Sequence, residues 1–179
     1  MPIGLKKGVV KLERHDKNWA KLFEEEKKIL LERFPNIILE VSHGGSTAIP
    51  NIVAKPIIDM FVAVPSLDDA ERLRTELEQL GYIYRGKEDV LERILYLRAS
   101  RDLTTHYLHF VEKNNDEWNS HLLIKEYYLE HPEAVKEYEL LKKKLAEQYP
   151  NDRKSYTNGK DEFIKSIIQK AKEKKLKNK

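Results

Sequence analysis

The chain has 179 residues, of which 40% are hydrophobic and 35% are charged, a balance typical of a globular protein with one well-packed core. The absence of cysteine excludes disulfide bonds and zinc–thiolate sites. No apolar run is long enough to span a bilayer, and the start of the chain, MPIGLKKGVV, lacks the apolar stretch of a signal peptide. We therefore expect a cytoplasmic protein with no membrane partner. The net charge of +3 owes much to the C-terminal tail KAKEKKLKNK, and the near-neutral body argues against nucleic acid as a partner.

The first half of the chain is predicted to alternate helices with strands. Hydrophobic spacing and turn residues predict, in chain order, a helix over 16–34, a strand over 37–41, a glycine loop at 44–45, a strand over 56–64 and a helix over 66–80. Asp16 is suited to cap the first helix, and Ser66 or Asp68 the second, which Gly81 is suited to end.

The second half shows three strand patterns and then only helical ones. The predicted strands are 82–85, 93–99 and 105–112, and the predicted helices are 116–130, 132–148 and one that begins at about 155. This order predicts an α+β fold, with one mixed β-sheet covered by helices and a helical C-terminal half. Short loops offer no boundary, so we predict a single domain over 1–179, with an N-terminal helix 16–34, a sheet-bearing core 37–112 and a helical part 116–175.

A single carboxylate, Asp59, interrupts the most strand-like run of the chain, PIIDMFVAV. Alternation along a strand places Asp59 on the same face as Ile57 and Phe61. Burying a lone carboxylate costs several kcal/mol, so Asp59 is expected to be paired, protonated or bound to a metal ion.

The segment before this strand has the composition of a phosphate-binding loop. Gly44 and Gly45 let the backbone approach a phosphate closely, and the amides after Ser46 lie at the start of a helical turn. Ser46 and Thr47 either bind phosphate or cap that turn. A phosphate loop near a strand carboxylate is the arrangement of metal-assisted phosphoryl transfer, which makes Asp59 the candidate catalytic residue and magnesium ligand.

This arrangement resembles the nucleotidyltransferase superfamily, which has the DNA polymerase β-like fold. The superfamily motif joins Gly-Gly or Gly-Ser, through a spacer of nine to thirteen residues, to a pair of carboxylates in the pattern Asp-x-Asp. Here Gly45 and Ser46 are followed by twelve residues and then by Asp59, but Phe61 stands where the second carboxylate is expected. The resemblance implies a nucleotidyltransferase with a degenerate metal motif.

The motif is more similar still to that of the GrpB family, a bacterial branch of the superfamily. Its usual form is His-x-Gly-Ser-Thr-Ala-x-Pro-Gly-x-x-x-Lys-Pro-Ile-Ile-Asp, and Asn51 replaces its commonest glycine here. The matching residues are His43, Gly45, Ser46, Thr47, Ala48, Pro50, Lys55, Pro56, Ile57, Ile58 and Asp59. Weaker blocks such as HYLHFVE, HLLIKEYYLEHPE and YTNGKDEFI extend the resemblance over about residues 7–170. The family implies a nucleotidyltransferase-like fold without a firmly assigned substrate, and some members are fused to dephospho-coenzyme A kinase.

Further polar residues are candidates to support the loop and the carboxylate. Lys55 either contacts phosphate or is solvated at the start of its strand, and His43 either orients the loop or binds ligand. The odd spacing of His106 and His109 puts them on opposite faces of a strand, so at most one shares the site of Asp59, and His109 is favoured by its more central position.

Three more positions complete the candidate set. Glu112 is an alternative to His109 as the second magnesium ligand, and Lys125 is placed to line the cleft from the first C-terminal helix. Tyr156 and Lys160 lie one helical turn apart and are either nucleotide contacts or a solvated pair.

Two classes of function follow. The first is an enzyme that transfers a nucleotidyl group, with magnesium, to a small acceptor. The second is a catalytically inactive relative that binds a nucleotide or phosphorylated metabolite and acts with a partner enzyme such as dephospho-coenzyme A kinase. Phe61 weakens the first class, and the complete glycine–serine loop weakens a purely structural role.

Overall fold

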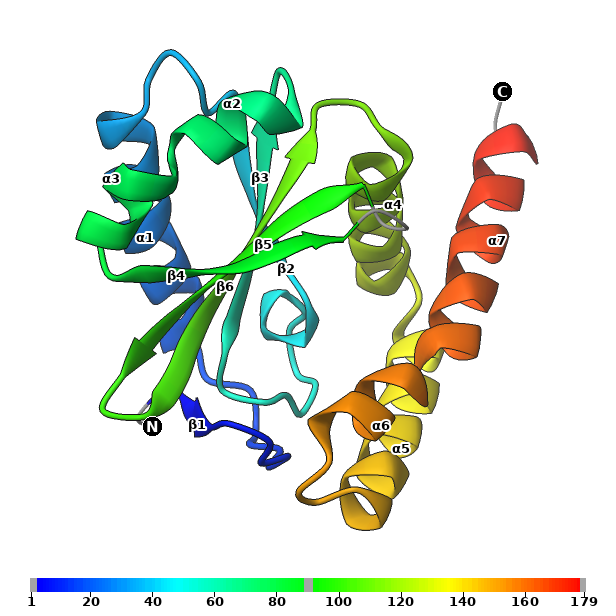
Figure 1. The fold of residues 1–179 in the computed structure, drawn as a ribbon. Coiled ribbons are helices and arrows are strands. Elements are labelled where there is room, and N and C mark those ends of the chain that lie inside the picture. Colours follow the sequence, from blue (N-terminus) through cyan, green and yellow to red (C-terminus); the bar gives the residue numbers. More distant parts are fainter. Residues whose placement is uncertain (1–2, 89–91, 178–179) are drawn as a thin grey trace.

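The computed structural model describes residues 3–88 and 92–177, and the strands of this part of the chain form one six-stranded sheet (Figure 1). The strands are β1 (Leu5–Lys6), β2 (Glu40–Gly44), β3 (Ile58–Val64), β4 (Tyr82–Glu88), β5 (Arg93–Ser100) and β6 (Leu103–Glu112). Their order is β2-β3-β6-β5-β4, with β1 paired to the start of β6. Strands β3 and β6 run parallel and the other neighbours antiparallel, which confirms the predicted mixed sheet.

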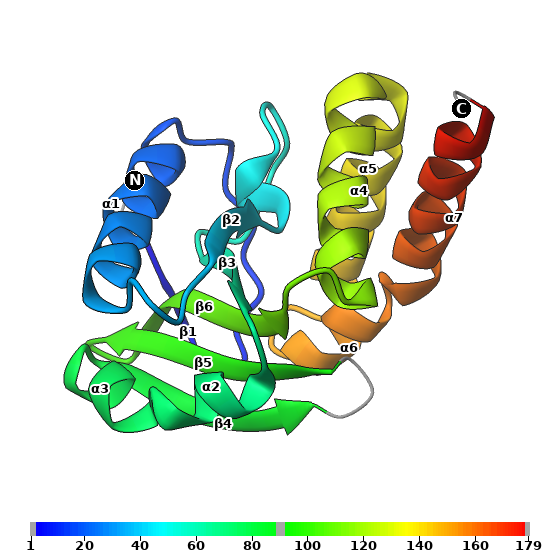
Figure 2. The same cartoon turned by 90° about the horizontal axis from the view of Figure 1, so that it is seen from above.

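Helices surround this sheet and make up the C-terminal half, as the α+β prediction requires. They are α1 (Asn18–Arg33), the 3₁₀ turn η1 (Ser46–Ala48), α2 (Leu67–Arg72), α3 (Arg74–Gln79), α4 (Asp116–Glu130), α5 (Pro132–Gln148), α6 (Arg153–Asn158) and α7 (Asp161–Lys177). Figure 2 shows α4, α5 and α7 side by side at one end of the molecule, with α1 at the other. Within the described residues, none of these helices is both long enough and apolar enough to cross a membrane.

One face of the sheet carries the main hydrophobic core. Ile58, Met60 and Val62 of β3 point to this face and are fully buried. They pack with Leu108 and Phe110 of β6 against the apolar sides of α1, α2 and α3. Alternation along the two strands therefore supplies a continuous apolar layer from every second residue.

The opposite face of the same strands is apolar only at one end. There, Ala63 and Val111 pack against Trp118 of α4. Towards the start of β3, this face carries Asp59, which lies beside Tyr107 in the parallel register of β3 and β6. Residues of the C-terminal helices α5 and α6 border this polar end.

The boundaries differ from the predictions where polar residues continue a strand. The predicted strand 37–41 begins later, because the amides of Ile37 and Ile38 donate to the carbonyl of Phe34 and close a turn. The strand then continues through Ser42 and His43 to Gly44, which was predicted to begin the loop. Pairing with β3 buries these residues, which their composition did not indicate.

Two predicted helices are each divided in the structure. The helix predicted over 66–80 forms α2 and α3, with Ser66 capping α2 through a bond from the amide of Asp69 as predicted. The helix predicted from about 155 forms α6 and α7. At the junction, a Cβ on Gly159 would lie 2.6 Å from the Leu145 side chain of α5. Glycine therefore permits a close approach that fixes the start of α7.

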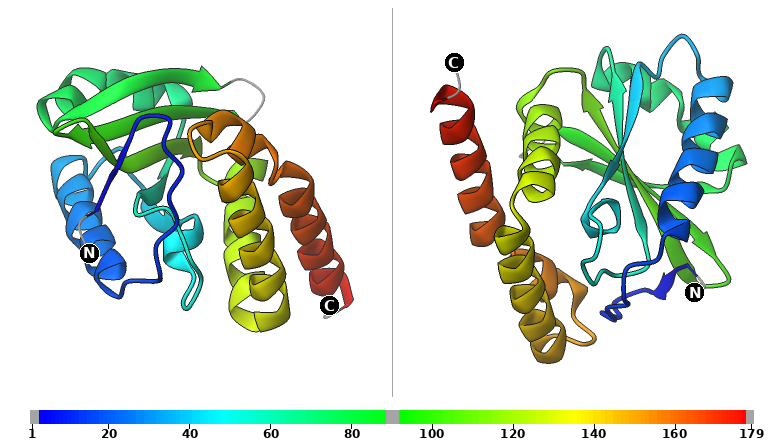
Figure 3. Two further views of the ribbon diagram at one scale, coloured as in Figure 1. Left: turned by 90° about the horizontal axis from the view of Figure 1, so that it is seen from below. Right: turned by 180° about the vertical axis from the view of Figure 1, so that it is seen from behind.

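The N-terminal segment, including the unpredicted strand β1, is tied to the C-terminal helices. Figure 3 shows it running past the sheet towards α6. The guanidinium of Arg153 donates to the carbonyls of Lys6 and Val9, each at 2.9 Å, and the amide of Val10 donates to the carbonyl of Pro150. Segments about 145 residues apart in the sequence are thereby joined beside the polar end of the sheet.

Candidate functional site

A cavity of about 310 Å³ opens beside the polar end of β3 and β6. It is lined from the β2–β3 connection, the sheet and the C-terminal helices by Gly45, Ser46, Thr47, Ala54, Lys55, Ile57, Asp59, Arg93, Leu95, Tyr107, His109, Tyr138, Arg153, Tyr156, Thr157 and Lys160. Eight candidate residues from the sequence line it: Gly45, Ser46, Thr47, Lys55, Asp59, His109, Tyr156 and Lys160. The structure thus brings together residues from both halves of the chain.

The glycine loop reaches the cavity in a conformation that favours glycine. Gly45 has φ of +62°, and a Cβ at this position would lie 2.4 Å from Oδ2 of Asp59. The amides of Ala48 and Ile49 donate to the carbonyl oxygens of Gly45 and Ser46 and so close the turn. The amides of Ser46 and Thr47 lie just before these two in the chain. The loop backbone therefore lies directly against the carboxylate of the motif.

Asp59 is paired with a histidine across the parallel strands. Its Oδ1 lies 3.3 Å from Nε2 of His109, whose Nδ1 is buried without a hydrogen-bond partner among the described residues. Burial raises the pKa of Asp59, but the hydrogen bond from His109 and the charges of His109, Lys55 and Lys160 outweigh it and lower that pKa below its ordinary value. Asp59 is therefore ionised at neutral pH.

Phe61 occupies the position of the missing second carboxylate in the motif. Its ring is stacked between two imidazoles, with centroids 4.8 Å from His109 and 4.0 Å from His121. His121 in turn shares a 2.9 Å hydrogen bond with Ser42 of β2. This stack fills the place that a second acidic side chain would need.

The donor set around Asp59 does not fit a two-metal centre. Within residues 3–88 and 92–177, no group of three or more histidines and carboxylates could hold a metal ion together. The alternative ligand Glu112 is not brought to the site: it lies beside Val64, five positions along the strand register from Asp59, and accepts a bond from the amide of Leu67. One carboxylate paired with an imidazole gives magnesium too few oxygen ligands.

Two lysines flank the ring of Tyr156 at the cavity. The Nζ atoms of Lys55 and Lys160 lie 5.2 Å and 4.8 Å from its centroid, which is cation–π geometry. Burial, followed by the charge of Lys160, lowers the pKa of Lys55 to about 7. Both lysines thus lie at the cavity, and their role as phosphate contacts stays a prediction.

Sequence analysis missed several lining residues, of which Arg153 is the most informative. One guanidinium nitrogen donates to the Tyr107 hydroxyl at 3.2 Å. Arg153, Tyr156, Thr157 and Lys160 all line the cavity; the first three share one face of α6, and Lys160 follows in the turn before α7. Extending the Tyr156–Lys160 pair by one turn in the sequence would have found Arg153. Arg93 and Tyr107 lack such a local signal, because the sheet alone brings them there.

Two predicted supporting residues lie behind the cavity instead of on its wall. His43 Nε2 is 3.0 Å from Oγ1 of Thr47, and the imidazole stacks on Phe23 at 4.6 Å. Burial, and then the charge of Lys125, lowers the pKa of His43 to about 4. His43 is therefore a neutral ring hydrogen-bonded to the loop, and Lys125 lies near this histidine and not among the described lining residues.

His106 does not share the site of Asp59. Its register partner is Ile58, so it points to the core face, where its Nδ1 lies 3.0 Å from the Thr105 hydroxyl. The expectation that only one of the two histidines reaches Asp59 is thus met by His109, because alternate residues of β6 face opposite sides of the sheet.

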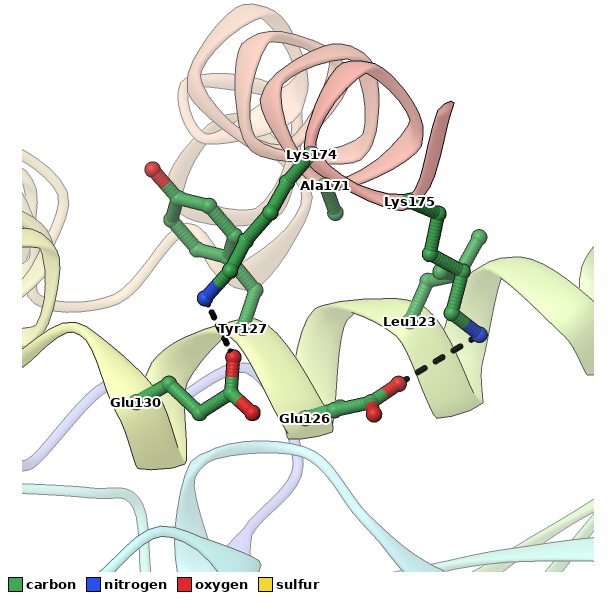
Figure 4. A pocket seen from close by; sticks show the side chains of 7 residues that line it. All are labelled: Leu123, Glu126, Tyr127, Glu130, Ala171, Lys174 and Lys175. Carbon is green, nitrogen blue, oxygen red and sulfur yellow. Dashed lines mark hydrogen bonds and ion pairs between the residues drawn. The ribbon is translucent and has the colours of Figure 1, made fainter. Parts of the chain in front are cut away.

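A second, smaller hollow of about 90 Å³ lies between α4 and α7 (Figure 4). Its lining residues are Leu123, Glu126, Tyr127, Glu130, Ala171, Lys174 and Lys175. Lys174 pairs with Glu130 at 2.5 Å and Lys175 with Glu126 at 3.4 Å. Each lysine here has its own carboxylate, so this hollow lacks the excess of cations that marks the larger cavity.

Comparisons with known proteins agree with the motif. Residues 9–170 match the family described as GrpB protein. The chain is 41% identical over 170 residues to the glutamate-rich protein GrpB of Alkalihalophilus pseudofirmus, covering 93% of this chain and 98% of that protein. The crystal structure of conserved protein GrpB from Enterococcus faecalis is 34% identical, with a TM-score of 0.84 over 93% of this chain and 99% of that chain. The structure of Cid1 in complex with its short product ApU is 16% identical, with a TM-score of 0.50 over 83% of this chain and 46% of that chain. This last likeness shows only that the fold is nucleotidyltransferase-like.

Proposed function

The chain belongs to the GrpB family, and we propose that its large cavity binds a nucleotide or a phosphorylated metabolite. The observation that carries the proposal is the meeting of three features in one cavity of about 310 Å³. These are the Gly45–Ser46 loop, the ionised Asp59 and the lysines around Tyr156. A glycine loop with nearby cations is suited to phosphate oxygens, and tyrosine supplies an apolar ring beside them.

Binding without transfer is the form of this function that the Phe61 stack favours. Two-metal nucleotidyl transfer uses two carboxylates to hold the ions that neutralise the reacting phosphates. Here Phe61 is held between His109 and His121, so a second ligand has no place in this conformation. Binding without transfer is therefore favoured over magnesium-dependent transfer, and action with a partner enzyme stays a prediction. Magnesium stays in the proposal as an ion to be tested together with the nucleotide.

A thermal-shift screen tests the proposal. Purified protein would be heated with nucleoside mono-, di- and triphosphates and with coenzyme A precursors, with and without magnesium. A ligand at a hundred times its dissociation constant is expected to stabilise the fold by about 2.7 kcal/mol. We expect Lys55→Met to abolish the ligand-induced shift and Lys154→Met, an exposed charge on α6 that does not line the cavity, to retain it.

The readout is the ligand-induced shift of each variant against its own unliganded melting temperature. This choice matters because removing the partly buried charge of Lys55 changes the baseline stability by itself. Absence of any shift across the whole screen, or an equal shift in wild type and Lys55→Met, would contradict the proposed site.

A further inference from the structure

We propose that the part of the cavity around Tyr156, between Lys55, Lys160 and Arg153, is a subsite for a diphosphate or triphosphate group bound without a divalent metal ion. The cations of the protein take the role that metal ions have in two-metal transferases. This inference rests on the proposed function, since it specifies the class of ligand for the same cavity.

The first support is the lack of carboxylate partners for these cations. Among residues 3–88 and 92–177, no carboxylate lies within 4.0 Å of the charged nitrogens of Lys55, Lys160 or Arg153. The guanidinium of Arg153 bonds only neutral oxygens in this part of the chain, those of Tyr107, Lys6 and Val9. The hollow of Figure 4 is the opposite case, because both of its lysines are ion-paired.

The second support is the repulsion between the positive charges of the cluster. Lys142 of α5 is 1% exposed, its Nζ donates to the carbonyl of Val53, and it lies over the Tyr138 ring at 4.8 Å. Burial, followed by the charge of Lys160, lowers the pKa of Lys142 to about 7, as it does for Lys55. Cations that repel one another away from water lower the stability of the protein without ligand. A bound anion offsets this repulsion.

The groups that face the partly buried Lys55 and the buried Lys142 come from several elements. Lys55 is influenced by Lys160 and Arg153 as like charges and by Asp59 as the opposing one. Lys142 is influenced by Lys160, Lys55 and Lys143, with Glu139 opposing. Glu139 is itself paired with Lys143 at 2.6 Å. Positive charge therefore dominates around both lysines.

The third support is the shortage of metal ligands next to these cations. Asp59, the one carboxylate among the described residues that line the cavity, is hydrogen-bonded to His109, and the Phe61 ring stands where the motif would have a second. A divalent ion beside Lys55 and Lys160 would add positive charge where the protein already has an excess. A phosphate group carries about two negative charges at neutral pH, so a cluster of three cations suits more than one phosphate group. Arginine and lysine together supply the donors that such oxygens need.

Isothermal titration calorimetry with sodium tripolyphosphate tests the inference. The titration would be run at pH 7 in EDTA and again with magnesium, on wild type, Lys160→Met and Lys154→Met. We expect wild type to bind in EDTA at least as tightly as with magnesium. Lys160→Met should weaken binding by about tenfold or more, because it removes a charged donor. Lys154→Met removes the same charge from the same region but from a residue outside the cavity, and should change affinity less than about twofold.

Should Lys160→Met fail to fold, Lys55→Met tests the same subsite. Circular dichroism checks that each variant is folded. Tripolyphosphate binding that requires magnesium, or equal weakening by Lys160→Met and Lys154→Met, would overturn the metal-free subsite. Nucleotides would still bind in that case, so the proposed function would stand. Absence of binding by tripolyphosphate and by every nucleotide would overturn both.

Discussion

The two faces of strands β3 and β6 are built from alternate residues of the same segments and have opposite properties. One face carries Ile58, Met60 and Val62, which are fully buried in the main core. The other carries Asp59 and Phe61 beside a cavity that Lys55, Arg153 and Lys160 line. The first face contributes the apolar burial that stabilises the fold. The second holds charges at a cost to stability, which is typical of a binding site.

Adjacent residues of one strand therefore contribute to different properties, one to the stability of the core and the next to the candidate site. Met60 and Asp59 are neighbours in sequence, yet Met60 is buried in the core while Asp59 lies against Gly45 and is hydrogen-bonded to His109. Substitutions at these two positions should therefore change different measurements.

The largest expected effect is on the stability of the core face. Met60→Ala removes a side chain with 0% exposure and should reduce the free energy of unfolding by about 2–5 kcal/mol. Asp59→Asn keeps the shape and should leave the fold largely intact while changing anion binding. Urea denaturation and tripolyphosphate titration of both variants check this. A Met60→Ala protein as stable as wild type would contradict the assignment of the faces.

Replacing the stacked ring of Phe61 by a carboxylate should give the site face a higher affinity for magnesium and lower the stability of the protein moderately. Phe61→Asp supplies the second carboxylate of the superfamily motif and loses the stacks with His109 and His121, so stability should fall by about 3 kcal/mol. Magnesium affinity should rise, since a second carboxylate adds an anionic oxygen ligand. Calorimetric titration with magnesium measures the gain. Unchanged magnesium affinity in a folded variant would show that Phe61 does not stand at the metal position.

A methyl group on the glycine loop should disturb the site face alone. Gly45→Ala adds a Cβ 2.4 Å from Asp59 at φ of +62°, and we expect a loss of about 2 kcal/mol together with weaker anion binding. Gly86→Ala is the matched control, because φ is +120° there but nothing lies within 4 Å of the added Cβ. It should lose stability through its backbone conformation and keep full binding. Equal binding by both variants would remove the loop from the site.

The smallest expected effect is the pH dependence of stability that His121, in the ring stack with Phe61, causes. Burial, and then the charge of Lys125, lowers the pKa of His121 to about 3 from its ordinary 6.5. The unfolded chain therefore binds the proton first, and stability is complete above pH 6.5 and is lost as the pH falls towards 3. Between pH 7 and about 5.5, this histidine should cost about 1 kcal/mol. His121→Gln should show a shallower fall of melting temperature over that range, and an unchanged slope would contradict the buried neutral ring.

Much of this contrast was accessible from the sequence, because strand alternation predicts the faces directly. Asp59, Phe61 and the separation of His106 from His109 follow from a period of two residues. The Gly45–Ser46 loop follows from residue type and from the family motif. Arg93 and Tyr107 did not follow, since only the pairing of β6 with β5 and with β3 brings them to the cavity. The division of the last helix at Gly159 depends on contact with Leu145, which local spacing does not encode.

A crystal structure of the protein grown with ADP in the presence of EDTA tests the central claim most directly. The claim is that the loop and the cations around Tyr156 bind phosphate in one cavity. We predict both phosphate groups between the amides of Ser46 and Thr47 and the side chains of Lys55 and Lys160, with Asp59 still paired to His109. Phosphates bound elsewhere on the molecule, with this cavity empty in the same crystal, would contradict the account.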